Sequence, residues 1–194
     1  MGKPWLDKEI QTINTDSAIF DADVAIANGD YNKAKEILLI AKNVDNEEIQ
    51  KRIITIEKQK IEYDATGFGV QQILEGKNPL IGPTIKGTTD QKILNATDNY
   101  LFGVAEKNNL NEEQTFAVVD DAFAKVGLVS PRYQETIEAG FTAGSATTFD
   151  SPADIPEVLI QAVKAAETAD QLGRLNLYTT DEQEIFFQNI IVSK

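Results

Sequence analysis

The sequence predicts an all-α protein, an irregular bundle of about seven to nine helices with one αα-hairpin near the N-terminus. Apolar residues recur three and four positions apart along nearly the whole chain of 194 residues. No run of alternating apolar and polar residues is bounded by hairpin turns, so strands are not expected. Capping residues precede most of the apolar segments, as they do at helix starts.

The first element is a helical hairpin from about residue 16 to residue 43, with its turn at Gly29-Asp30-Tyr31. The inner face of its second helix carries Ile37, Leu38 and Ala41. The segment 29–34 resembles the turn and second helix of a tetratricopeptide repeat, in which small residues such as Ala34 let two helices cross closely. Because no second copy follows, we expect a single hairpin.

A third helix begins after Asn46, weakens near Thr66-Gly67 and resumes as far as Gly76. Its apolar stripe consists of Ile49, Ile53 and Ile56. The segment 77–88 contains two prolines and three glycine or asparagine turn signals, and it cannot be helical. It divides the chain into an N-terminal helical part (1–76), a connector (77–88) and a C-terminal acidic bundle (89–194), either as separate domains or as one continuous domain.

Two helices begin the C-terminal part, one at Thr89-Asp90 and one at Asn111, and a short turn between them predicts antiparallel packing. Their apolar positions are Ile93, Leu94, Leu101, Val104, Phe116, Val119, Phe123 and Val126. Gly127 then suits the left-handed residue that ends a helix. Ser130 is the cap of a further helix that begins with Pro131.

We expect that helix to be short and broken by Gly140 and Gly144. Ser151-Pro152 repeats the combination of cap and proline, and it opens an alanine-rich segment from Val158 to Leu172. An alanine stripe allows a neighbouring helix to approach closely.

The last helix begins after Thr180, and its apolar residues cover more than one face. A helix of that kind is buried on two sides or contacts another chain. The candidate protein-contact residues are Phe186, Phe187, Ile190 and Ile191. The chain ends soon after them at Lys194 without a cap, and we therefore expect a natural polypeptide that continues beyond it.

Composition excludes several classes of function. The chain has no cysteine and no histidine, which removes thiolate nucleophiles, the usual base of serine hydrolases and the commonest zinc ligands. Its net charge is −13, concentrated in residues 98–194, so specific nucleic-acid binding is not expected. No transmembrane segment and no signal-peptide core are present in the sequence.

Paired acids occur at Glu47-Glu48, Glu112-Glu113, Asp120-Asp121 and Asp181-Glu182. Three of the four pairs follow a capping residue, where a helix N-terminus favours negative charge without any catalytic role. The nearest approaches to a calcium loop, at Asp150-Pro152-Asp154 and at Asp21-Asp23, lack the glycine and glutamate of an EF-hand. We therefore predict no catalytic residues, no metal site and no cofactor.

From about Gly69 to Phe187, the order of features resembles the helical body of the internal core or ejection proteins of short-tailed bacteriophages. The residues that carry this resemblance are Gly127-Leu128-Val129-Ser130-Pro131, the helix from Ile137 to Gly140, Ala143-Gly144-Ser145 and the helix from Val158 to Leu172. The resemblance implies a virion protein that stacks inside the capsid and forms a channel for genome delivery. The shortness of the chain for that family implies a fragment or a small relative.

The expected function is thus that of a non-enzymatic structural and assembly module of a phage virion. Its partners would be further copies of itself and other virion proteins, and its location the virion interior, or otherwise the cytoplasm as a soluble protein. The first alternative is a tetratricopeptide-like protein–protein adaptor. The second is a carboxylate-dependent glycan hydrolase, whose catalytic groups would come from the acidic pairs.

Overall fold

The computed structural model describes residues 4–41, 46–145 and 154–192 and confirms the all-α class. These residues form nine α-helices and no strand. Contacts divide the chain into two compact units, Met1–Ala65 with Lys86–Thr88 and Thr66–Ile85 with Thr89–Lys194. The division falls inside the third helix, whereas the sequence places its connector at residues 77–88.

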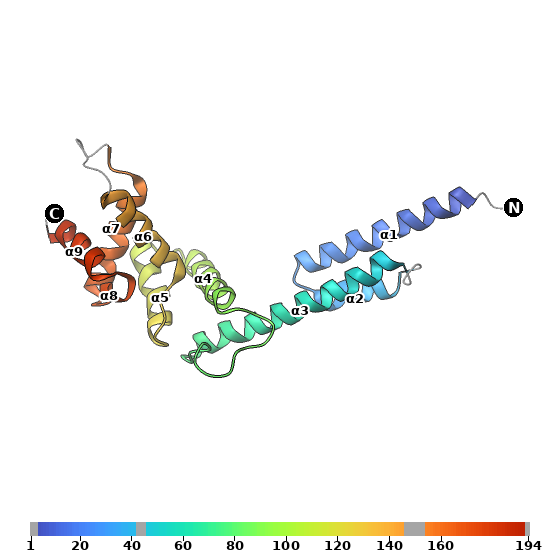
Figure 1. Ribbon diagram of the computed structural model, residues 1–194, viewed down its shortest axis with the longest axis horizontal. Helices are drawn as coiled ribbons and strands as arrows, with labels where there is room; N and C mark the ends of the chain where they lie inside the picture. Colours follow the sequence, from blue (N-terminus) through green and yellow to red (C-terminus); the bar gives the residue numbers. More distant parts are fainter. Residues whose placement is uncertain (1–3, 42–45, 146–153, 193–194) are drawn as a thin grey trace. The chain divides into compact units, whose positions relative to one another are not determined.

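Unit 1 contains α1 (Pro4–Ala27), α2 (Tyr31–Leu39) and the first part of α3 (Glu47–Leu74) (Figure 1). The predicted hairpin turn is confirmed, because Gly29 has a φ of 75° and the Asp30 carboxylate accepts a hydrogen bond from the Lys33 backbone N–H at 2.9 Å. The first helix begins at Pro4, well before the start expected at about residue 16. Proline is compatible with this start because it is tolerated in the first turn of a helix.

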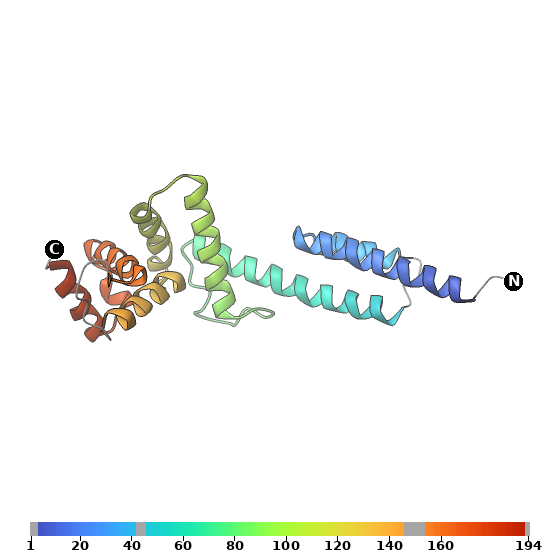
Figure 2. The ribbon, with the colours of Figure 1, turned by 90° about the horizontal axis from the view of Figure 1, so that it is seen from above.

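The core of unit 1 is built from small residues of α1 and α2 and from isoleucines of α3. Its buried members are Ala22, Ala25, Ala34, Leu38, Ile49, Ile53 and Ile56. Figure 2 shows α1 and α2 lying beside the first part of α3. The Arg52–Asp23 and Lys35–Glu57 ion pairs join α3 to α1 and to α2. The alanines therefore act as the tetratricopeptide-like pattern predicts, by allowing close helix packing.

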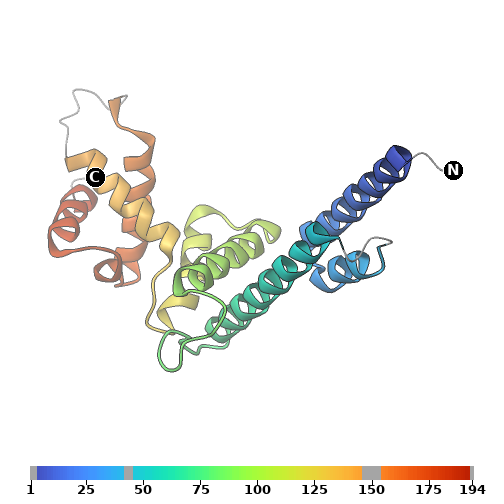
Figure 3. The same cartoon turned by 45° about the vertical axis from the view of Figure 1, so that its right-hand side comes forward.

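The third helix is continuous to Leu74, so the predicted weakening of the helix at Thr66-Gly67 is wrong. A Cβ atom at Gly69 would lie 2.6 Å from Cδ1 of Ile93 in α4 (Asp90–Lys107), so the glycine permits a contact that compensates for its low helix propensity. The segment from residue 77 to residue 88 is non-helical, as predicted (Figure 3). Within it, the Asn78 side chain donates a hydrogen bond of 2.7 Å to the Val126 carbonyl.

Unit 2 contains the rest of α3, α4, α5 (Glu112–Ala124), α6 (Pro131–Ser145), α7 (Glu157–Gln171), α8 (Leu175–Tyr178) and α9 (Asp181–Val192). The predicted caps at Thr89, Asn111 and Thr180 are confirmed by hydrogen bonds from the backbone N–H three residues later. At Gly127, a φ of 71° ends α5 as expected. Local cap chemistry therefore sets most of these helix starts.

The expected break of α6 at Gly140 and Gly144 is wrong, because the helix is continuous to Ser145. Both glycines lie where neighbouring helices approach α6. A Cβ atom at Gly140 would overlap the Ala162 methyl group, and one at Gly144 would lie 3.1 Å from Leu159 Cδ1. The α7 helix begins at Glu157, and the predicted cap at Ser151-Pro152 lies outside the described residues.

Two apolar clusters fill unit 2. The cluster of α3, α4 and α5 contains Ile73, Ile93, Leu101, Val119, Phe123 and Val126. The larger cluster is formed mainly by α6, α7, α8 and α9, and its buried residues are Phe116, Ile137, Leu159, Ala162, Val163, Ala165, Ala166, Ala169, Leu175, Tyr178 and Phe187. Alanines make up much of the α7 contribution, which agrees with the close approach of α6.

Candidate functional sites

The four residues predicted to contact other proteins lie on α9. Phe187 is fully buried in the core of unit 2. The prediction that it contacts another protein is corrected, because the residues packed around it belong to its own chain. Phe186, Ile190 and Ile191 are half-buried and pack against the same core. A contact between these three and another protein stays a prediction.

A buried carboxylate of α4 fixes the start of α6. Asp98 accepts one hydrogen bond from the Ser130 hydroxyl at 2.7 Å and one from the Arg132 backbone N–H at 2.9 Å. Ser130 itself accepts a hydrogen bond from the Tyr133 backbone N–H at 3.4 Å, as a cap residue does. Burial raises the pKa of Asp98, and the hydrogen bonds from Arg132 and Ser130 oppose that rise. The predicted Ser130 cap is thus confirmed, and the Asp98 carboxylate supports it from α4.

The Asp120 carboxylate is also buried, although it belongs to one of the paired acids. It forms an ion pair with Arg174 and accepts a 2.8 Å hydrogen bond from the Tyr178 hydroxyl. Burial, followed by the hydrogen bond to Asp120, raises the pKa of Tyr178. Asp120 therefore joins α5 to α8. The other three acidic pairs lie in first helical turns, where the sequence placed them.

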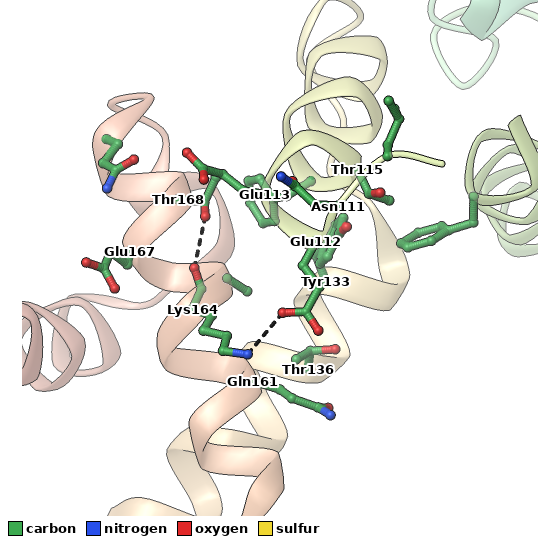
Figure 4. Close-up of a pocket in the computed structure, with 15 residues that line it drawn as sticks. Asn111, Glu112, Glu113, Thr115, Tyr133, Thr136, Gln161, Lys164, Glu167 and Thr168 are labelled. Carbon is green, nitrogen blue, oxygen red and sulfur yellow. Dashed lines mark hydrogen bonds and ion pairs between the residues drawn. The ribbon is translucent and has the colours of Figure 1, made fainter. Parts of the chain in front are cut away.

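A groove of about 840 Å³ lies in unit 2 between the start of α5 and one face of α7 (Figure 4). Aromatic rings form its floor: the ring centroids of Phe116 and Tyr133 are 4.4 Å apart, and Phe102 lies 5.3 Å from Tyr133. On its rim, the Lys164 ammonium group donates a 3.1 Å hydrogen bond to the Glu112 carboxylate.

The groove brings one acidic pair, Glu112-Glu113, near Glu167 of α7. The Glu112 side chain is 78% exposed and is already ion-paired with Lys164. A glycosidase general acid requires a carboxyl group shielded from water, so this arrangement does not favour the hydrolase alternative. The groove is better suited to contact with an apolar side chain on its aromatic floor.

Neither metal coordination nor membrane crossing finds support in the described part of the chain. No group of three or more acidic residues there is arranged to hold a metal ion, and this includes Asp21 and Asp23. The other candidate calcium loop includes Asp150 and Pro152, which lie outside the described residues. None of the helices within 4–41, 46–145 and 154–192 is long and apolar enough to cross a membrane.

A second apolar surface, which the sequence interpretation missed, runs along α1 on the side away from the core of unit 1. We call it the outer stripe, and its large members are Leu6, Ile10, Ile13, Phe20 and Val24. Each is between 45% and 67% exposed, whereas Ala22 and Ala25 on the opposite side are buried. The spacing of these members, which is four, three, seven and four residues, could have revealed the stripe from the sequence.

The described residues form an all-α protein with buried polar contacts at Asp98 and Asp120, a groove with an aromatic floor, and a helix, α1, that is apolar on two faces. No protein-family model, curated protein or solved structure matches the chain.

Proposed function

We propose that this chain is a non-enzymatic structural module that assembles with other proteins by helix-to-helix contact. The outer stripe of α1 carries the proposal. One face of α1 packs into the core of unit 1, and the opposite face exposes large apolar side chains such as Ile13 and Phe20. A helix that is apolar on two opposite faces is typical of one that is covered on both.

The proposed setting is the virion interior of a short-tailed phage, with other virion proteins as partners. The Ser130 cap and the small residues between Gly127 and Ser145 support this setting through their resemblance to internal core proteins, although Ala143-Gly144-Ser145 lies within α6 and forms no turn. The acidity of the chain, with a net charge of −13, is compatible with a position beside packaged DNA, since such a surface does not retain DNA.

Mass spectrometry of purified phage particles directly tests the proposed location in the virion. We expect the chain in several copies per particle, and its absence from intact particles would refute the virion role.

The structural role of the stripe is tested with a double variant that combines Ile13→Ala and Phe20→Ala. Because both side chains are exposed, the variant should fold normally but enter particles poorly.

Thr12→Ala is the matched control. Thr12 is exposed on the same helix and lies outside the outer stripe. Equal incorporation of the control and of the double variant would show that the outer stripe has no part in assembly.

A further inference from the structure

We propose that the outer stripe of α1 binds one amphipathic helix of another protein, whose heptad-spaced apolar residues are flanked by lysine and arginine. The inference rests on the proposed function and specifies its partner. It follows from three properties of α1: the period of the stripe, the charge beside it, and the occupancy of the opposite face.

The period is that of a coiled coil. One core position of the heptad is occupied by Leu6, Ile13, Phe20 and Ala27, and the other by Ile10, Ser17 and Val24. The mean spacing of 3.5 residues keeps a seam facing a second helix, whereas the interior of a globular protein needs no such regularity. Ile10 and Val24, the two β-branched residues at the second position, favour a two-stranded arrangement. The stripe therefore fits one partner helix.

The flanking positions of the heptad are strongly acidic. Asp7 and Asp21 lie on one side of the seam, and Glu9, Asp16 and Asp23 lie on the other. Asp23 forms an ion pair with Arg52 of α3. Among the residues that the structure describes, no ion pair involves Asp7, Glu9, Asp16 or Asp21, and all four are exposed.

This charge distribution selects the partner. A second α1 helix would place acidic residues opposite acidic residues in either orientation, and like charges at these positions oppose pairing. A helix with lysine or arginine at the flanking positions would instead form attractive pairs with Asp7, Glu9, Asp16 and Asp21. An anionic membrane surface is disfavoured for the same reason as a second copy.

The opposite face of α1 is already occupied. Ala18, Ile19, Ala22, Ala25 and Ile26 face the core of unit 1. The partner helix can therefore reach only the outer stripe, and the complex should contain one partner helix for each chain.

The test uses the full chain and two fluorescent synthetic heptad peptides. Both peptides carry isoleucine and leucine at the core positions, but one has lysine and the other glutamate at the flanking positions. We expect binding of the lysine peptide, measured by fluorescence anisotropy, at least about tenfold tighter than binding of the glutamate peptide. Binding should weaken as the ionic strength rises.

A charge-reversed chain provides the specific control. Replacement of Asp7, Glu9, Asp16 and Asp21 by lysine should invert the preference between the two peptides. The same number of replacements in unit 2, at Glu106, Glu135, Glu138 and Asp170, changes the net charge equally and should leave the preference unchanged.

Several results would overturn the inference. Equal binding of both peptides, with loss of both in the Ile13→Ala, Phe20→Ala variant, would leave the stripe a docking surface but remove its charge selectivity. Concentration-dependent dimerisation of the parent chain that the same variant abolishes would make a second copy the occupant. Binding of the chain to phosphatidylcholine vesicles, without binding to either peptide, would make a lipid surface the occupant of the stripe. Failure of particle incorporation, by contrast, concerns the proposed function alone.

Discussion

Replacement of Gly140 by alanine should destabilise unit 2, although alanine is the better helix former. In an open helix, alanine stabilises relative to glycine by about 1 kcal/mol. At Gly140 the new methyl group would lie less than 3.0 Å from the methyl group of Ala162, a distance at which Cβ contacts essentially do not occur. It would also lie 3.2 Å from the Val158 carbonyl oxygen. Neither neighbour is the free end of a long side chain, so α6 and α7 must separate.

Overpacking of this kind costs about 1–3 kcal/mol. After the gain of about 1 kcal/mol in helix propensity is subtracted, the free energy of unfolding should fall by up to about 2 kcal/mol. Gly103 is the matched control, because it lies within α4 and a Cβ atom there would meet nothing within 4 Å. Gly103→Ala should therefore stabilise the protein by about 0.4–1 kcal/mol.

The measurement is urea denaturation together with hydrogen exchange of peptides from α6 and α7. The sole tryptophan, Trp5, belongs to unit 1 and does not report on this packing. Gly140→Ala combined with Ala162→Gly should recover part of the loss, since the double variant removes the overlap between the two methyl groups. If Gly140→Ala is as stable as Gly103→Ala, the contact between Gly140 and Ala162 does not limit the packing of α6 on α7.

Phe187→Ala should lower the free energy of unfolding by about 3–5 kcal/mol, whereas Ile185→Ala, at a 60% exposed position of the same helix, should change it by less than about 0.5 kcal/mol; circular dichroism during urea titration measures both. Because burial raises the pKa of Asp98, the folded state takes up its proton more readily than the unfolded chain. The stability of the parent relative to Asp98→Asn should therefore fall as the pH rises from about 3.9 through the folded pKa. Asn78→Ala removes the hydrogen bond to Val126 and should cost about 1 kcal/mol in thermal unfolding.

Each of these outcomes can fail in a defined way. Equal losses at Phe187 and Ile185 would mean that α9 is not anchored by its buried phenylalanine. A stability difference between the parent and Asp98→Asn that does not change with pH would show that Asp98 has the same proton affinity in both states. An unchanged melting temperature for Asn78→Ala would remove the role of that hydrogen bond in fixing the connector.

Helix starts were predictable because their chemistry is local. Thr89, Asn111, Ser130 and Thr180 each cap a helix with a side-chain oxygen that reaches a backbone N–H three residues on. The glycines in helix interiors were misjudged, since their effect depends on a distant neighbour. Gly140 is tolerated because Ala162, on another helix, occupies the space that a side chain would need.

The sites were harder to predict, because burial decides their character. Asp120 belongs to the one acidic pair that follows no capping residue, but its burial depends on Arg174 and Tyr178, which are more than 50 residues away in the sequence. Phe187 was expected at a protein contact because the helix is apolar on several faces, but two of those faces are covered by unit 2 itself. The outer stripe of α1 was detectable in principle, from its heptad spacing alone.

The Asp120 contact has a consequence for synthesis of the chain on the ribosome. Asp120 emerges before Arg174 and Tyr178, its two side-chain partners, which lie more than 50 residues further on. Until α8 has been made, the carboxylate has only water to stabilise its charge, and burying it in the core would be costly. Unit 2 therefore closes late, when α8 arrives, and chains that terminate before Tyr178 leave Phe116 and its neighbours open to aggregation.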